Sequence, residues 1–438
     1  LKAGAGSSRL LPHPDAAPAA PGPMALSAVS PAAKASAFVA HARAAHGAHA
    51  PAQLHLATAT PALVSGGRGA SGAAGLAGAA ASRGFAHVAG GAAGSVCALT
   101  LAVAGVLRAR RRGAGRRAGP VARRAVVFID GEAGTTGLQV RERLDAHPGI
   151  EILSLPAESR KDESARKEAL RSADAAVLCL PDDAAIAAVE LVGDADTVVV
   201  DASTAHRVAD GWVYGFPELT ADHKKAIAAS KRIANPGCYP TGFIALTRPL
   251  VDAGLLPAEA ALTVPAVSGY SGGGKGLIEI FEGSEHEPWG AYGFGLNHKH
   301  LPEMAKWTGL QHEPLFCPSV GNFKQGMVVS VPIRMSQLAP GTTPGAVHQA
   351  LQERYTGSRF VSVADSLNPD GVLERGAFLR PDTVNDTNNL ELFCFGNEGK
   401  GTLWLLARLD NLGKGASGAC VQNLNLALGF DEAAGLEA

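Results

Sequence analysis

Charged residues are distributed so unevenly along this chain that only part of it can be expected to fold. Residues 1–124 contain 14 lysines and arginines but a single acid, Asp15, and are rich in alanine, glycine, serine and proline. Neither helical nor strand periodicity extends over a useful length there, so this segment lacks the pattern that buries a core. The other 314 residues carry 25 basic and 39 acidic side chains, and their length suffices for two domains.

The first segment has the composition of an organellar leader, because it is rich in alanine, serine and arginine and almost free of acids. We expect residues 1–124 to be a disordered targeting leader, for the plastid stroma or, alternatively, the mitochondrial matrix. Plain low-complexity sequence without an address is the other interpretation. The apolar stretch at 90–107 is short and rich in small residues, so no stable membrane anchor is expected. The acidic remainder argues against a nucleic-acid partner.

Short apolar runs alternate with helical patterns in residues 125–237. The runs lie at 126–129, 150–155, 175–180 and 197–201. This alternation predicts an α/β domain with a Rossmann-like, doubly wound parallel sheet. Residues 412–438 begin with glycines and continue as a helical pattern, and we expect them to complete this domain.

The pattern changes after residue 237 to strands rich in threonine and valine, separated by glycine-rich loops. The clearest runs are 262–267, 327–333 and 403–409. They predict a mixed α+β catalytic and oligomerisation domain over residues 238–411, with a largely antiparallel sheet. An exposed mixed sheet there favours a homo-oligomer, either a dimer or a tetramer.

One cysteine lies where a nucleophile would be placed. Cys238 occupies the proline- and glycine-containing turn IANPGCYPTG (233–242), after a predicted strand and at the start of a predicted helix. Partial exposure and helix N-terminal N–H groups would lower the pKa of such a thiol. A buried structural cysteine is the alternative. The six cysteines show no metal-like or disulfide-like spacing, so no metal is predicted and a reducing compartment fits.

A nucleotide site is predicted where the first strand ends. The turn GEAGTTG follows that strand and opens a helix, and small residues there let a pyrophosphate approach the helix N-terminus. About 20 residues further on, a turn offers Ser159, Arg160 and Lys161 to a 2′-phosphate, which favours NADP. Glu158 beside them could instead bind a 2′-hydroxyl and favour NAD. The predicted contacts in the first turn are Gly131, Gly134, Thr135, Thr136 and Gly137.

A second group of polar side chains follows in NHKHLPE (297–303). Two histidines and an acid so close together can supply a general acid/base with an orienting carboxylate. The residues alone do not choose between His298 and His300. Metal ligation is a weak rival, because no distant ligands accompany the pair, and a surface loop without function is the simplest alternative.

These motifs together resemble those of the N-acetyl-γ-glutamyl-phosphate reductases. The resemblance rests on GEAGTTG, NPGCYPTG, HKHLPE, SVGNFKQGM and KGASGACVQNLNLALG, and covers nearly all of residues 125–438. It implies NADPH-dependent reduction of N-acetyl-γ-glutamyl phosphate to N-acetylglutamate semialdehyde, with release of phosphate, in arginine biosynthesis. By the resemblance, Cys238 forms an acyl-thioester, His300 is the acid/base and Glu303 orients it.

The resemblance also implies further contacts. Asn411, Lys414 and Gly415 would complete the nucleotide site. Arg207, Ser203 and Lys275 are the candidates for binding substrate carboxylate or phosphate. Aspartate-semialdehyde dehydrogenase shares the chemical plan and is the nearest enzymatic alternative. A catalytically silent NADP-binding protein and a cysteine hydrolase are the alternatives from other classes.

Overall fold

The computed structural model describes residues 123–284 and 286–438. The leader expected at 1–124 therefore lies outside the described residues, apart from its last two positions, and so does the apolar stretch at 90–107. The fold described below begins at Arg123.

Six short strands of the first half form one entirely parallel sheet. They are β1 (Ala125–Asp130), β2 (Ile150–Leu153), β3 (Ala175–Leu178), β4 (Val198–Asp201), β5 (Val213–Tyr214) and β6 (Arg232–Ala234). Their spatial order is β2-β1-β3-β4-β6-β5. β3 and β4 are buried along their whole length, as expected for strands covered on both faces. The predicted α/β fold class is confirmed.

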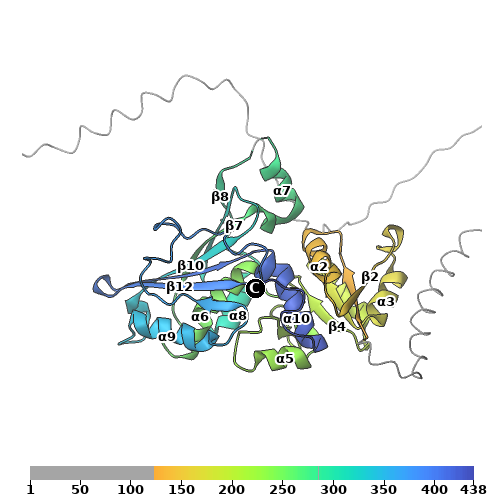
Figure 1. Cartoon of the computed structure of the whole chain (residues 1–438), viewed down its shortest axis with the longest axis horizontal. Helices are drawn as coiled ribbons and strands as arrows, with labels where there is room; N and C mark the ends of the chain where they lie inside the picture. Colours follow the sequence, from red (N-terminus) through yellow and green to blue (C-terminus); the bar gives the residue numbers. More distant parts are fainter. Residues whose placement is uncertain (1–122, 285) are drawn as a thin grey trace, which may run out of the picture. The chain divides into compact units, whose positions relative to one another are not determined.

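Helices cover both faces of this sheet. One face packs against α2 (Thr135–Asp145), α5 (His223–Ala229) and α10 (Gly418–Leu428). The other packs against α3 (Glu163–Ser172) and α4 (Asp182–Val192). Figure 1 shows α10, the last helix of the chain, beside α5 and β4 of this first sheet. Residues far apart in sequence therefore build one apolar core.

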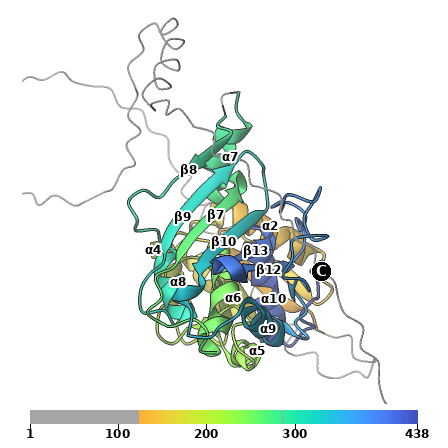
Figure 2. The ribbon, with the colours of Figure 1, turned by 90° about the vertical axis from the view of Figure 1, so that its left-hand side faces the viewer.

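The second half forms a seven-stranded mixed sheet in the order β11-β12-β13-β10-β7-β9-β8. Its strands are β7 (Thr263–Gly269), β8 (Trp289–Ala291), β9 (Leu315–Gly321), β10 (Met327–Arg334), β11 (Val361–Val363), β12 (Leu390–Asn397) and β13 (Thr402–Leu409). Figure 2 shows β9, β7 and β10 as neighbours. The β7–β9 and β11–β12 pairs are parallel, so the sheet is more mixed than the largely antiparallel one predicted.

Helices pack on one face of this second sheet. They are α6 (Cys238–Asp252), α8 (Leu301–Thr308) and α9 (Pro344–Tyr355). α7 (Gly274–Glu282) follows β7 through a short 3₁₀ turn, Tyr270–Gly273. We call the opposite face, turned away from these helices, the outer face.

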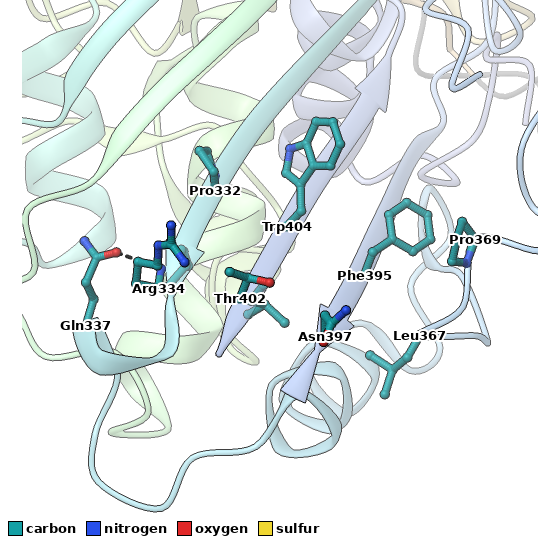
Figure 3. A pocket seen from close by; sticks show the side chains of 12 residues that line it. Pro332, Arg334, Gln337, Leu367, Pro369, Phe395, Asn397, Thr402 and Trp404 are labelled. Carbon is teal, nitrogen blue, oxygen red and sulfur yellow. Dashed lines mark hydrogen bonds between the residues drawn. The ribbon is translucent and has the colours of Figure 1, made fainter. Parts of the chain in front are cut away.

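Part of the outer face is apolar and exposed to solvent. Pro332, Trp404 and Phe395 stand opposite one another on β10, β13 and β12, and Figure 3 shows their side chains on the same face. Trp404 retains 53% of its exposure, and Trp289 retains 57%. Two cavities of about 510 and 500 Å³ lie along this face. Neither is lined by Cys238, so they do not mark the predicted active site.

Candidate active site

Parallel strands bring three of the predicted motifs to one edge of the first sheet. The glycine-rich turn follows β1, the segment that carries Arg207 follows β4, and the turn that carries Cys238 follows β6. Because all these strands run in the same direction, their carboxyl ends meet at a single edge, where ligands of such folds bind. The sequence placed each motif after a strand, and the sheet topology brings them together.

Cys238 is the first residue of α6, and Gly237 is its N-cap. A β-carbon on Gly237 would lie 2.7 Å from Nη1 of Arg207, 2.7 Å from Oε1 of Glu303 and 2.8 Å from Nε2 of His300. Only glycine therefore fits there. The residue next to the thiol is surrounded by the three side chains that the sequence had singled out.

The Cys238 thiol does not have the lowered pKa that its position at a helix start suggested. Burial raises this pKa, and although Arg207 and the N–H of Tyr239 act to lower it, burial dominates. The folded protein therefore holds Cys238 as a thiol at neutral pH, and an acceptor for its proton is needed if the sulfur is to attack.

Glu303 anchors this turn, and it does not orient His300. Its carboxylate accepts hydrogen bonds from Nη1 of Arg207 (2.7 Å), from the Tyr214 hydroxyl (2.8 Å) and from the N–H of Gly237 (3.1 Å). The side chain is 1% exposed. The predicted Glu303–His300 pairing is thus replaced by an ion pair with Arg207, and Glu303 holds together β5, α8 and the turn before Cys238.

His300 is buried and carries no charge at neutral pH. It caps α8, and burial, reinforced by Arg207 and His298, holds its pKa well below 6.5. Its Nδ1 atom is buried without a hydrogen-bond partner among the described residues. A neutral imidazole has a free ring nitrogen that can accept a proton, so His300, next to the Cys238 turn, is a candidate acceptor for the thiol proton.

The geometry separates the two histidines. The His298 ring lies 4.7 Å from the His300 ring in an edge-on contact, and its Nδ1 accepts the N–H of His300. His298 is half-buried and is not among the nearest neighbours of Gly237, whereas His300 is. His300 is therefore the histidine next to the cysteine turn.

Arg207 is fixed by three hydrogen bonds. Besides its bond to Glu303, it donates to the carbonyl oxygens of Asn235 (2.9 Å) and Ala202 (3.1 Å). A guanidinium has five N–H groups, so two are left for an anion. The position of Arg207 beside Gly237 fits the predicted role in substrate binding.

Ser203 has a different partner from the one predicted. Its hydroxyl donates to Asp201 (2.6 Å), and the same carboxylate contacts Nδ1 of His206 (2.6 Å). These buried contacts shape the segment between β4 and Arg207. Ser203 is thus part of the scaffold that places Arg207.

The glycine-rich turn has the shape that a nucleotide site requires. Gly131 has φ +87°, and a β-carbon there would lie 2.3 Å from the carbonyl oxygen of Cys179. A β-carbon on Gly137 would lie 2.4 Å from the carbonyl oxygen of Gly131. The N-cap Gly134 leaves the start of α2 without a side-chain cap, and its first turn has no acid. Thr135 and Thr136 begin that helix, so its N–H groups can receive a phosphate.

An acidic residue inside this turn organises two arginines. Glu132 is 8% exposed and forms ion pairs with Arg160 (2.6 Å) and Arg141 (2.8 Å). Arg141 also donates to Ser154 (2.7 Å). Glu132 thereby joins the glycine-rich turn to the turn predicted to bind a 2′-phosphate.

Ser159 and Lys161, the other two residues predicted to bind the 2′-phosphate, are not held by ion pairs in the part of the chain that the structure describes. Lys161 is exposed, Ser159 is half-buried, and neither has a side-chain partner among the described residues. Arg160 is exposed despite its ion pair. The turn therefore presents two exposed cationic side chains, Arg160 and Lys161, and its role in binding a 2′-phosphate stays a prediction.

Two residues of the returning segment 411–415, both predicted as nucleotide contacts, have buried protein partners. Asn411 donates to the Ser271 hydroxyl (3.1 Å) and accepts the N–H of Gly326 (2.8 Å). Lys414 is 1% exposed, and its ammonium group binds Glu218. Gly415 does lie at the site, since a β-carbon there would be 2.8 Å from the β-carbon of Cys238.

Lys275 is exposed on the first turn of α7, and its side chain has no hydrogen-bond or ion-pair partner in the described part of the chain. Nothing links it to the Cys238 turn. Within residues 123–284 and 286–438 no group of histidine, cysteine and acidic side chains is arranged to hold a metal ion. Over the same residues, none of the helices combines the length and apolarity that crossing a bilayer requires.

Sequence reasoning missed several residues of the site. Tyr214 lies on a two-residue strand, and nothing in its neighbourhood distinguished it. Asn235 belonged to the cysteine motif, yet its role as a link between Arg207 and the returning segment depends on contacts between distant residues. Glu132 could have been recognised as an unusual acid in a phosphate-binding turn.

Family models match both halves of the described fold. Residues 126–227 match the semialdehyde dehydrogenase NAD-binding domain, and residues 238–411 match the semialdehyde dehydrogenase dimerisation domain. The predicted nicotinamide-nucleotide domain is thereby confirmed.

Curated relatives align over most of the chain. A protein of Nostoc sp. named N-acetyl-gamma-glutamyl-phosphate reductase 2 is 49% identical over 319 residues, which cover 71% of this chain and 98% of that protein. An N-acetyl-gamma-glutamyl-phosphate reductase of Chelativorans sp. is 50% identical over 306 residues, which cover 69% of this chain and 98% of that protein.

Solved structures share the fold at low identity. Aspartate semialdehyde dehydrogenase II of Vibrio cholerae, complexed with ASA, superposes with a TM-score of 0.53 at 14% identity and covers 70% of this chain and 98% of that one. The Candida albicans aspartate semialdehyde dehydrogenase with NADP gives a TM-score of 0.51 at 16% identity and covers 69% of this chain and 98% of that one. At these identities the likeness establishes the fold alone.

Proposed function

Because this chain belongs to the N-acetyl-γ-glutamyl-phosphate reductase family, we propose that it reduces N-acetyl-γ-glutamyl phosphate to N-acetylglutamate semialdehyde in arginine biosynthesis. One observation carries the proposal. Arg207, Glu303 and His300 surround Gly237, the residue directly before Cys238. In support of the proposal, the thiol-bearing turn, a neutral imidazole and a guanidinium meet at the carboxyl edge of the first sheet, where ligands of such folds bind.

The first step is thioester formation at Cys238. The sulfur attacks the acyl carbon, the S–H proton passes to the neutral imidazole of His300, and the bond from the acyl carbon to the phosphate oxygen breaks. Phosphate leaves with the bonding electron pair. A thioester accepts hydride more readily than a carboxylate does, which is the chemical reason for covalent capture.

Arg207 binds the negative charge of the substrate, and Glu303 holds Arg207 and the Cys238 turn in position. The two unused N–H groups of Arg207 can bind a substrate carboxylate or the phosphate group. Glu303 keeps Arg207 in place and accepts the N–H of Gly237, which fixes the turn that presents the thiol. Tyr214 supports Glu303 from the other side. After the thioester has been reduced, the carbon–sulfur bond breaks, and the imidazole of His300 returns its proton to the sulfur of Cys238.

The nucleotide-binding turn fits NADP. When bound, NADPH supplies the hydride that reduces the thioester. The N-terminus of α2 would hold its pyrophosphate, and Arg160, with Lys161 and Arg141 near it, would hold the 2′-phosphate. Replacing Arg160 and Lys161 by alanine is expected to weaken NADPH binding much more than NADH binding, and equal losses would place the 2′-phosphate elsewhere.

The decisive experiment measures phosphate-dependent reduction of NADP by the purified protein with N-acetylglutamate semialdehyde and with aspartate semialdehyde. Preference for the acetylated substrate, lost in Cys238→Ser, supports the proposal. Preference for the aspartyl substrate would make the chain an aspartate-semialdehyde dehydrogenase. Activity without nucleotide would indicate a cysteine hydrolase, and inactivity with both substrates a silent NADP-binding protein.

The assembly is proposed to be a homodimer or tetramer formed through the outer face. Two observations support this: residues 238–411 match a dimerisation-domain model, and apolar side chains such as Trp404, Trp289 and Phe294 remain exposed. Phe294 retains 80% of its exposure. Exposed apolar side chains that cluster in this way mark protein–protein interaction sites.

The compartment is proposed to be the plastid stroma, with the mitochondrial matrix as the alternative. The support is compositional: residues 1–124 are basic and almost free of acids. Both family models begin after this segment, the first at residue 126. The location of a fluorescent protein fused to residues 1–124 in plant cells tests the proposal. Retention in the cytosol would contradict it.

A further inference from the structure

A fully buried lysine lies on the segment that packs behind the nucleophile. Lys414 is 1% exposed, and its ammonium group donates to both carboxylate oxygens of Glu218 (2.9 and 3.0 Å) and to Oε1 of Gln422 (2.7 Å). An ammonium has three N–H donors, so all are used. The ammonium also lies 5.5 Å above the ring of Phe216.

Stability alone does not account for this arrangement. Removing an ion pair from water costs several kcal/mol, which the attraction between the charges often only offsets, and apolar replacements of such pairs can be neutral or stabilising. Unlike an apolar contact, the ion pair has hydrogen bonds that require a defined geometry. Three bonds fix the ammonium group in one place, and through it the backbone that carries the side chain.

That backbone is unusual. Residues Gly413–Ser417 form a π-helical turn directly before α10. π-Helical turns are rare and are frequently found at functional sites. Asn411, which precedes the turn, and Lys414 and Gly415, which lie in it, were predicted together as nucleotide contacts, but they have three different surroundings.

One side of the turn touches the nucleophile. The α-carbon of Gly415 lies so close to Cys238 that an added β-carbon would be 2.8 Å from the β-carbon of Cys238 and 3.3 Å from its α-carbon. The next carbonyl oxygen, that of Ala416, accepts the side-chain N–H of Asn235 (3.1 Å). Asn235 in turn accepts Nε of Arg207. The turn therefore contacts both the thiol-bearing residue and the support of the anion-binding arginine.

The opposite side of the turn is the buried charge cluster. Gln422 joins Lys414 and Glu218 to Glu432, which pairs with Lys224 on α5. The cluster thus ties the π-helical turn to α10 and α5, which belong to the nucleotide-binding domain. Cys238 begins a helix of the second domain, so the turn lies between the two.

We propose that Lys414 and Glu218 are positioning residues that hold the π-helical turn against Cys238 and thereby set the place of the thiol relative to the bound substrate and cofactor. This rests on the proposed role of Cys238 as nucleophile. Neither residue touches the reacting groups. Their effect passes through the Gly415–Cys238 contact, where small displacements matter, because a misplacement of about 1 Å can cost about 100-fold in rate.

The test compares Lys414→Met and Glu218→Gln with wild type. We expect kcat to fall by about 10- to 100-fold, while NADPH affinity, measured by fluorescence titration, stays within about twofold. Alkylation of Cys238 by iodoacetamide, followed by mass spectrometry of its peptide, should become faster as the turn loosens. A structural role alone would lower the melting temperature and move none of these quantities in the folded protein.

The matched control is Arg408→Met, because Arg408, on β13, is also buried (6% exposed) and paired with two acids, Glu391 on β12 and Glu374 in the segment between β11 and β12. It should cost stability but leave kcat and Cys238 alkylation unchanged. Should Lys414→Met fail to fold, the double variant Lys414→Met/Glu218→Met removes both charges together and is expected to fold, still with reduced kcat.

Unchanged kcat and unchanged alkylation in folded variants would overturn the proposal. Weakened NADPH binding with unchanged alkylation would also overturn it and would return Lys414 to the nucleotide site. Failure of the proposed function is detected separately: it fails if Cys238→Ser keeps its turnover. The alkylation rates of wild type and the Lys414 variant do not depend on turnover, so they test the positioning role on its own.

Discussion

At the scale of single residues, the site is controlled by burial more than by the helix terminus at which Cys238 lies. Burial raises the pKa of Cys238 and lowers that of His300, so both groups are uncharged at neutral pH. The ion pair of Arg207 with Glu303 supplies the fixed charges. A thiol that stays protonated is a weak nucleophile, so the free protein holds Cys238 in its less reactive form.

The raised pKa of Cys238 predicts how the thiol reacts without substrate. Because only the thiolate is nucleophilic, alkylation by iodoacetamide should still accelerate as the pH rises through 9. Mass spectrometry of the Cys238 peptide measures the rate, with the exposed Cys317 as the reference in the same digest. A rate that levels off below pH 8 would show that the thiol is ionised at neutral pH.

The lowered pKa of His300 predicts acid sensitivity. In the unfolded chain the imidazole binds a proton below about pH 6.5, but the folded protein holds it neutral to a lower pH, so stability falls as the pH drops below 6.5. His300→Gln should remove about 1 kcal/mol of the stability loss between pH 7.5 and 5.5. Urea unfolding at both values measures it. Equal losses in both proteins would mean that the folded enzyme protonates His300.

At the scale of elements, close backbone contacts decide how the site is built. The turn after β1 admits no side chain at Gly131 or Gly137, and α6 begins at a position where only glycine can precede the cysteine. The same turns that look like loops in the sequence are packed as tightly as the strands.

Gly137→Ala should weaken NADPH binding and destabilise the fold by about 1–3 kcal/mol, because the new β-carbon would lie 2.4 Å from the carbonyl oxygen of Gly131. Isothermal titration and thermal unfolding measure the two effects. Gly276→Ala is the control: it is helical, has nothing within 4 Å of its added β-carbon, and should be neutral or slightly stabilising. Unaltered NADPH binding in Gly137→Ala would mean that the turn can relax.

At the scale of the assembly, the outer face of the second sheet is the surface that lacks a cover. Part of it is closed by the chain itself, since Val328, Phe393 and Leu406 are buried against residues of the 364–379 segment. The rest, around Trp404, is exposed, since this side chain retains 53% of its exposure. Figure 3 shows Trp404 next to Pro332 and Phe395.

Trp404→Glu should therefore shift the protein toward monomers, because it places a charge at the centre of an apolar interface. Size-exclusion chromatography with light scattering measures the mass. Ile186→Glu is the matched control, since Ile186 is also exposed (44%) but lies on α4 of the other domain. An unchanged mass for Trp404→Glu, or an equal loss in the control, would contradict this interface.

Local sequence determined much of this protein. The apolar runs at 175–180 and 197–201 located β3 and β4 to within two residues, and the glycine spacing of GEAGTTG predicted the turn that the structure shows after β1. The cysteine motif also predicted a strand, a turn and a helix start correctly. These features depend on backbone preferences and on periodic burial, which act over a few neighbouring residues.

Tertiary structure alone decided which groups meet. The sequence offered Glu303 as a partner for His300 three residues away, but folding brings Arg207 and Tyr214, about 90 residues distant, to its carboxylate instead. Lys414 was predicted as a nucleotide contact, and only the folded structure shows its burial against Glu218. The pKa of Cys238 changes direction for the same reason, since desolvation depends on everything packed around the thiol and not on the helix that it begins.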